Sequence, residues 1–160
     1  MGIITFSMFL PSIWFCHIDK KNKIHMDIQS SLYKFCKEKN IDKVLRMDND
    51  ITYWNISDKY TGDNKTQMKL KELKKLYEYY CDKIKLIDKC YTNDTVLLII
   101  SHDKLELLYG LFVCFMIKYA DLPLNKSMMS AKNKIGLTIQ ISRKLTDLLK
   151  YYKSQNDKHK

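Results

Sequence analysis

Four consecutive polar residues, Ser101-His102-Asp103-Lys104, interrupt the most apolar part of the chain. They follow an apolar run, Leu97 to Ile100, and precede a second one that begins at Leu105. This order predicts a buried strand, a short loop and a helix, and the backbone N–H groups at the start of such a helix favour an anion. The stretch is a candidate phosphate-binding scaffold, and Ser101 beside His102 is a candidate nucleophile with its base.

The same loop lacks three residue types that usually complete a phosphate site. It contains no glycine, cysteine or arginine. Glycine lets a loop backbone close around a phosphate, a cysteine thiolate can attack it, and the arginine fork binds two of its oxygens. In addition, Ser101 and His102 leave a strand as neighbours, so their side chains are expected to diverge. The strand–loop–helix order therefore favours phosphate binding, whereas the missing residue types argue against a phosphate-handling site.

Two carboxylates ahead of the longest predicted helix are candidates for a general acid. Asp58 and Asp63 lie in the polar stretch from Ser57 to Thr66. A protonated carboxyl can give a proton to a leaving group, but aspartate is also common in turns and at helix starts. Asp63 lies closer to the predicted helix start at Gln67, and the turn-and-cap interpretation is preferred for both residues.

Hydrophobic periodicity predicts the elements that would position these residues. Strands are expected within residues 3–18, as a pair with a break at Pro11-Ser12, and at 44–47, 51–56 and 97–100. Helices are expected from Asp27 to about residue 40, and at 67–90, 105–119, 125–133 and 139–152. This alternation indicates an α/β domain with a central mixed sheet flanked by helices. Ligands of such folds bind beyond the C-terminal ends of the central strands, which is where Ser101 lies.

Length and charge limit the remaining possibilities. The 160 residues fit one domain, expected to occupy residues 1–153, with a frayed basic tail at 154–160. A formal charge of +10 favours acidic partners. Because Arg46 and Arg143 are the only arginines and the lysines are spread along the chain, most of this charge is expected to be solvated surface. The longest apolar run, Leu107 to Ile117, is too short to span a membrane.

The five cysteines are odd in number and lie mostly within apolar segments. They show no CxxC or Cys/His spacing, and the four histidines have no mutual spacing typical of a metal site. We therefore expect reduced thiols in the cytoplasm or the nucleus, no metal and no cofactor.

The order of these elements resembles the dual-specificity branch of the protein tyrosine phosphatases, whose signature is a strand, the loop HCxxGxxR and an apolar helix. Leu97–Ser101 and Cys114–Lys118 match that pattern with the family's spacing. Further segments are similar to the family's other strands and to the helix after the signature: Leu10–Phe15, Ile41–Met47, Tyr53–Ile56, Leu122–Leu124 and Ser130–Lys132. The resemblance implies a cysteine-phosphatase-like architecture over nearly the whole chain.

The resemblance fails at the residues that carry the family's chemistry. In this alignment the nucleophilic cysteine falls on Ser101, its preceding histidine on Ile100, the loop glycine on Lys104 and the phosphate-binding arginine on Leu107. No cysteine of the chain has an arginine six residues later. The family's general acid would match Asp63 or Asp58. Without the phosphate loop, Ser101 with Glu106 nearby fits better as the cap of the following helix.

The leading hypothesis is a catalytically inactive phosphatase-like protein, or pseudophosphatase, that acts by binding another protein. One alternative is an active phosphatase on phosphoprotein or RNA 5′ phosphate with a non-standard site at Ser101 and His102. Another is a basic nucleic-acid-binding module. The resemblance and the Lys/Asn/Ile-rich composition suggest a large DNA virus as the source.

Overall fold

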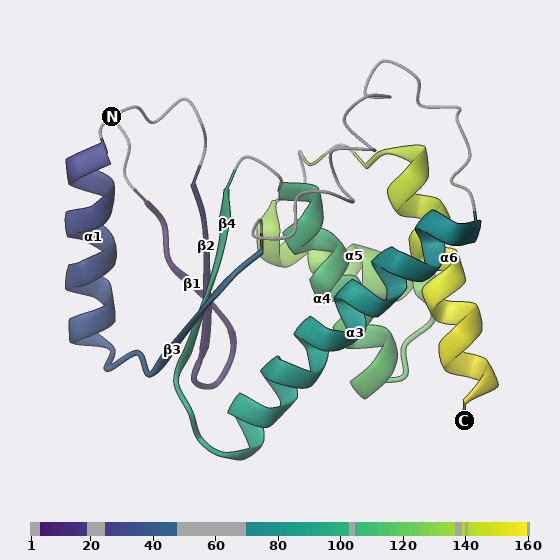
Figure 1. The fold of residues 1–160 in the computed structure, drawn as a ribbon, viewed down its shortest axis with the longest axis horizontal. Coiled ribbons are helices and arrows are strands. Elements are labelled where there is room, and N and C mark those ends of the chain that lie inside the picture. Colours follow the sequence, from purple (N-terminus) through teal and green to yellow (C-terminus); the bar gives the residue numbers. More distant parts are fainter. Residues whose placement is uncertain are drawn as a thin grey trace. The chain divides into compact units, whose positions relative to one another are not determined.

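The computed structural model describes residues 4–18, 25–47, 70–102, 105–136, 139 and 141–159. The chain divides into two compact units, one made of Met1–Asn49 with Lys85–Leu105 and the other of Asp50–Ile84 with Glu106–Lys160. The first unit contains the sheet and the second is helical where the structure describes it (Figure 1). The mixed sheet and the helices confirm the predicted α/β class.

Among the described residues, the sheet of the first unit has four strands in the order β1-β2-β4-β3. Their bounds are Ser7–Leu10 for β1, Ile13–Ile18 for β2, Lys43–Arg46 for β3 and Leu97–His102 for β4. β1 is antiparallel to β2, whereas β2 and β3 are both parallel to β4. The C-terminal ends of β2, β3 and β4 therefore lie at one edge of the sheet, the edge at which a ligand is expected from the sequence.

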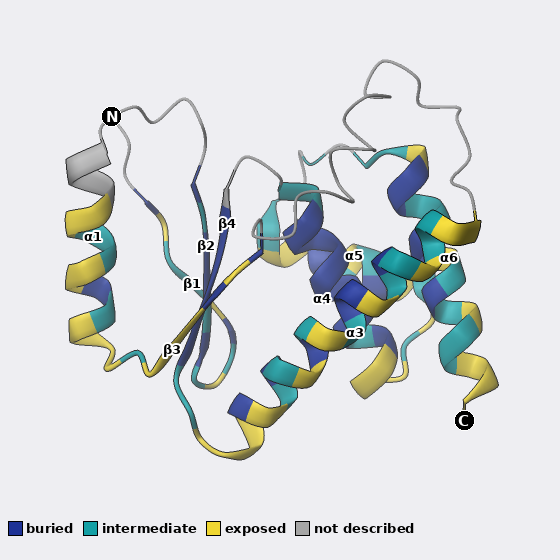
Figure 2. Cartoon of the chain, in the orientation of Figure 1, coloured by how far each residue is buried: buried dark blue, intermediate teal, exposed yellow. Residues whose placement is uncertain are grey.

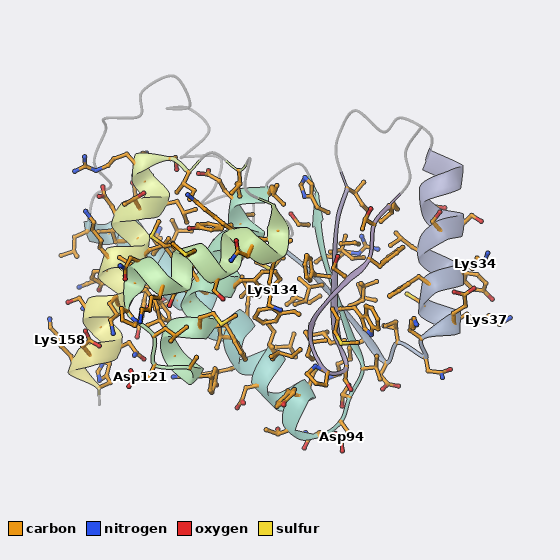
Figure 3. All side chains as sticks on the ribbon, turned by 180° about the vertical axis from the view of Figure 1, so that it is seen from behind. Lys34, Lys37, Asp94, Asp121, Lys134 and Lys158 are labelled. Atoms are coloured by element: carbon orange, nitrogen blue, oxygen red, sulfur yellow. The ribbon has the colours of Figure 1, made fainter. Side chains whose placement is uncertain are left out.

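Helix α1, His25–Glu38, covers one face of this sheet (Figure 1). The residues buried between them form one cluster: Ile4, Cys16, Ile18, Phe35, Leu98 and Ile100. The opposite side of α1 carries the exposed Lys34 and Lys37 (Figure 3). Since α1 begins at His25, Asp27 lies inside the helix and is not its predicted cap.

The second unit is built from α4, Leu105–Tyr119, α5, Leu124–Ile135, α6, Arg143–Lys158, and the first part of α3, Leu70–Thr92. Helix α4 is buried along most of its length, in agreement with its almost uniformly apolar sequence (Figure 2). Its Phe112 and Tyr109 are among the largest fully buried side chains. The predicted bounds of α4 are confirmed.

Helix α6 differs from its prediction at both ends. It begins at Arg143 rather than residue 139, because the Ser142 side chain accepts a hydrogen bond from the Leu145 N–H and caps the first turn. It also continues to Lys158, so that most of the expected frayed tail is helical. The Lys153–Asp157 ion pair, 2.9 Å long, supports this extension.

Other predictions lie outside the described residues. These are the strand at 51–56, the loop with Asp58 and Asp63, and the residues Asp103 and Lys104.

Candidate active site

Ser101, the position matched to the family's nucleophile, is buried in β4. Its side chain is 1% exposed, and its Oγ lies 3.0 Å from Nδ1 of His17 in β2. The two strands are parallel and their register places His17 directly beside Ser101. A hydroxyl next to an imidazole nitrogen is the contact that a general base makes with a serine nucleophile.

The structure gives Ser101 a partner that the sequence did not indicate, since the base considered from the sequence was His102. His102 is the last residue of β4, while the hydrogen bond to Ser101 comes from His17, 84 residues away. The available signal was weak: His17 is a polar residue in an otherwise apolar strand. Only the strand order and register identify it as the neighbour of Ser101.

The preceding residues of both strands on the face of the His17–Ser101 pair are apolar. Side chains alternate between the faces of a strand, so the pair shares its face with Phe15 and Ile99, which are 6% and 0% exposed. Burial of a polar group is costly unless it is hydrogen-bonded, and this contact gives a partner to the Ser101 hydroxyl and to Nδ1 of His17. His17 and Ser101 are thus arranged like a base and a nucleophile, but the Ser101 hydroxyl is almost inaccessible.

Leu107, the position matched to the phosphate-binding arginine, lies in the first turns of α4. It is 3% exposed, and its carbonyl oxygen accepts a hydrogen bond of 3.0 Å from the Tyr80 hydroxyl. Its aliphatic side chain offers no donor to a phosphate. Leu107 is therefore part of the helical core.

Four of the five thiols, those of Cys16, Cys36, Cys90 and Cys114, are poorly suited to replace the missing nucleophile. Burial, followed by the neighbouring Cys36, raises the pKa of Cys16 to about 12, although the charge of Arg46 lowers it. Burial also raises the pKa values of Cys36, Cys90 and Cys114. A nucleophilic cysteine needs a depressed pKa, because the thiolate is the reactive form.

Glu106 has a different partner from the one predicted. The sequence suggested a cap on α4 together with Ser101, but the Glu106 carboxylate accepts a hydrogen bond from the backbone N–H of Ser142. Ser142 is itself the N-cap of α6. Glu106 thus joins the first turn of α4 to the start of α6, and its negative charge lies where a helix N-terminus favours it.

A Glu106→Ala variant should lose about 1 kcal/mol of unfolding free energy, because the Ser142 N–H loses its acceptor and the α6 terminus loses a favourable charge. Urea unfolding followed by circular dichroism measures the difference. Glu72→Ala, in the first turn of α3, is the matched control. Equal losses in both variants would contradict a specific role for Glu106.

No group of three metal-ligating side chains occurs among the described residues. In the same part of the chain, no helix is long and apolar enough to cross a membrane.

Neither a model of a known protein family nor a curated protein matches this sequence. Solved structures do. The chain is similar to a leucine rich repeat and phosphatase domain containing protein from Entamoeba histolytica, with a TM-score of 0.65 and 15% identity over 97% of this chain and 94% of that one. It is also similar to a mutant form of Tk-PTP, with a TM-score of 0.62 and 11% identity over 96% of this chain and 97% of that one. The chain therefore has a protein tyrosine phosphatase-like fold, as its sequence predicted.

Proposed function

We propose that this chain is a catalytically inactive phosphatase of the dual-specificity type that acts by binding another protein. The observation that carries the proposal is the state of Ser101. It occupies the position matched to the nucleophilic cysteine, and it is 1% exposed and hydrogen-bonded to His17. A serine held in this way fits a role in packing better than one in attacking a substrate phosphate.

Two further observations support the proposal. Leu107, at the position of the phosphate-binding arginine, is buried and aliphatic. The loss of a guanidinium removes the bidentate contact that neutralises a transferring phosphoryl group. The raised pKa values of Cys16 and Cys114 also leave these thiols protonated at neutral pH.

The hydrogen bond between His17 and Ser101 favours a second candidate function. An active phosphatase with a non-standard site would use Ser101 as nucleophile and His17 as general base, on phosphoprotein or RNA 5′ phosphate. This candidate requires the Ser101 hydroxyl to become accessible to a phosphate. Its burial argues for the inactive protein as the first choice.

Purified wild-type protein is expected to hydrolyse p-nitrophenyl phosphate, a phosphotyrosine peptide and an RNA 5′-triphosphate no faster than its Ser101→Ala variant. The reason is that neither a thiolate nor an arginine is available at the matched positions. Phosphate release measures the rates, and Ser130→Ala serves as a serine control in α5.

Turnover that Asp63→Ala abolishes would contradict the proposed inactivity and support Asp63 as a retained general acid; Asp58→Ala tests the other aspartate. Turnover lost in both Ser101→Ala and His17→Ala, but kept in Ser130→Ala, would establish the second candidate. Turnover unaffected by any of these variants would place an active site elsewhere and also overturn the proposal.

The proposal includes one phosphatase-like domain over residues 1–153, a reducing compartment such as the cytoplasm or the nucleus, and a large DNA virus as the source. The free cysteines Cys16, Cys36, Cys81, Cys90 and Cys114 support the reducing compartment.

A further inference from the structure

A pocket of about 510 Å³ lies beside helix α6 of the second unit. One wall is Leu124, the first residue of α5. The rest of the lining comes from α6: Lys150, Lys153, Ser154, Asp157 and Lys158. Three cations and one carboxylate thus surround this pocket.

The spacing of these residues places them on one side of α6. Lys150, Ser154 and Lys158 follow one another at intervals of four residues, which keeps them on the same helix face. Both lysines are exposed, and Lys158 extends away from the end of α6 (Figure 3). Within the described part of the chain, no ion pair involves either of them.

The remaining lysine is already paired. Lys153 contacts the Asp157 carboxylate at 2.9 Å, and Asp157 is the one acidic residue among the described residues of the lining. The positive charge available to a ligand therefore comes from Lys150 and Lys158. Their long methylene stems and Leu124 give the pocket apolar surface next to that charge.

The start of α5 adds to the positive potential. Pro123 provides no side-chain cap, and the first turn of α5 has no acidic residue. No carboxylate of that turn offsets the partial positive charge of the helix N-terminus. Leu124 lies at this terminus and also lines the pocket.

We propose that this lysine pocket binds an acidic segment of a partner protein, with carboxylates at Lys150 and Lys158 and an apolar side chain against Leu124. The inference rests on the proposed protein-binding function and names the surface used. Charge complementarity supports this proposal, since a carboxylate-rich segment supplies negatively charged partners for Lys150 and Lys158. A nucleic acid is less well matched, because none of the described residues that line the pocket is an arginine for phosphate forks or an aromatic residue for base stacking.

The test uses the full chain and a fluorescein-labelled synthetic peptide with repeated Leu-Glu-Glu units. A counterpart with Gln for every Glu and a short single-stranded RNA are the other probes. We expect the acidic peptide to bind, and the double variant Lys150→Glu/Lys158→Glu to raise its Kd by about tenfold at low salt. The double variant Lys71→Glu/Lys74→Glu, with the same charge change at exposed sites on α3, should leave the Kd within about twofold.

If the two double variants raised the Kd of the acidic peptide equally, the proposal would be overturned, because the net charge of the protein alone would then explain the binding. Equal binding of the Gln peptide, or tighter binding of the RNA through Lys150 and Lys158, would also overturn it. If the acidic peptide did not bind at all, the proposal would be overturned as well. Circular dichroism checks that both double variants are folded. Phosphatase assays decide the proposed inactivity independently, so the two proposals can fail separately.

Discussion

A Gly110→Ala variant is expected to have a free energy of unfolding about 2 kcal/mol lower than that of the wild-type chain, even though alanine has a higher helix propensity than glycine. Gly110 lies in the middle of α4. A Cβ atom there would lie 2.5 Å from the Tyr80 hydroxyl oxygen, 2.9 Å from its ring carbon Cζ and 3.1 Å from Leu145 Cδ1. The Tyr80 ring is rigid and fully buried, so it has little room to move away.

Urea unfolding followed by circular dichroism measures the loss, and Tyr80→Phe provides the matched background. That change removes the closest oxygen together with its hydrogen bond to the Leu107 carbonyl. Gly110→Ala should therefore cost less in the phenylalanine background than in the wild type, by about 1 kcal/mol. A Gly110→Ala variant as stable as the wild type would show that α4 and Tyr80 are not packed this closely.

Alkaline pH is expected to destabilise the chain steeply. Burial raises the pKa of Tyr109 to about 12. Burial, followed by a contribution from Cys114, also raises the pKa values of Tyr80 and Tyr152. Below about pH 10 these phenols are neutral in both states. Above it, the unfolded chain ionises first, and each tyrosine should remove about 1.4 kcal/mol of stability per pH unit until the folded pKa is reached. The three together predict a loss of about 3 kcal/mol between pH 10 and pH 11, because the unfolded phenols are only half ionised at pH 10. The raised pKa values of the buried Cys16 and Cys114 thiols add to this loss.

Urea unfolding across this pH range gives the slope, and the ultraviolet absorbance of tyrosinate reports when the phenols ionise. Tyr109→Phe should reduce the slope by about 1 kcal/mol per pH unit, because one buried phenol no longer ionises. The hydroxyl that it removes makes a 3.4 Å contact with the Met128 carbonyl. Tyr33→Phe, at a residue that is 68% exposed, is the control and should leave the slope unchanged. Ionisation of the phenols in the folded chain near pH 10 would contradict the prediction.

The sequence predicted the helices and strands best where burial requires an apolar residue at almost every position. Helix α4 has its predicted bounds because almost every position from Leu105 to Tyr119 is apolar. The strand from Leu97 is likewise apolar at each of its first four positions, all at most 1% exposed. These patterns are readable because each successive turn of a buried helix, or each residue of a buried strand, needs another apolar side chain.

The contacts at the candidate site were less predictable because each joins segments far apart in the chain. Nothing near Ser101 in the sequence marks His17 as its neighbour; the parallel pairing of β2 with β4 does so. The same holds for Glu106, whose acceptor role at Ser142 depends on how α4 and α6 meet. Single polar contacts leave no periodic signal, whereas apolar faces do.

The pairing of β2 with β4 also has a consequence for synthesis on the ribosome. His17 and Ser101 are 84 residues apart, so the β1–β2 hairpin is made long before β4 can join it. At bacterial and eukaryotic elongation rates the delay is roughly 4 to 17 s. During that time one edge of β2 and the apolar side chains of Phe15 and Ile18 lack their final strand partner. This interval is when the nascent chain is most exposed to misassociation and most dependent on chaperones.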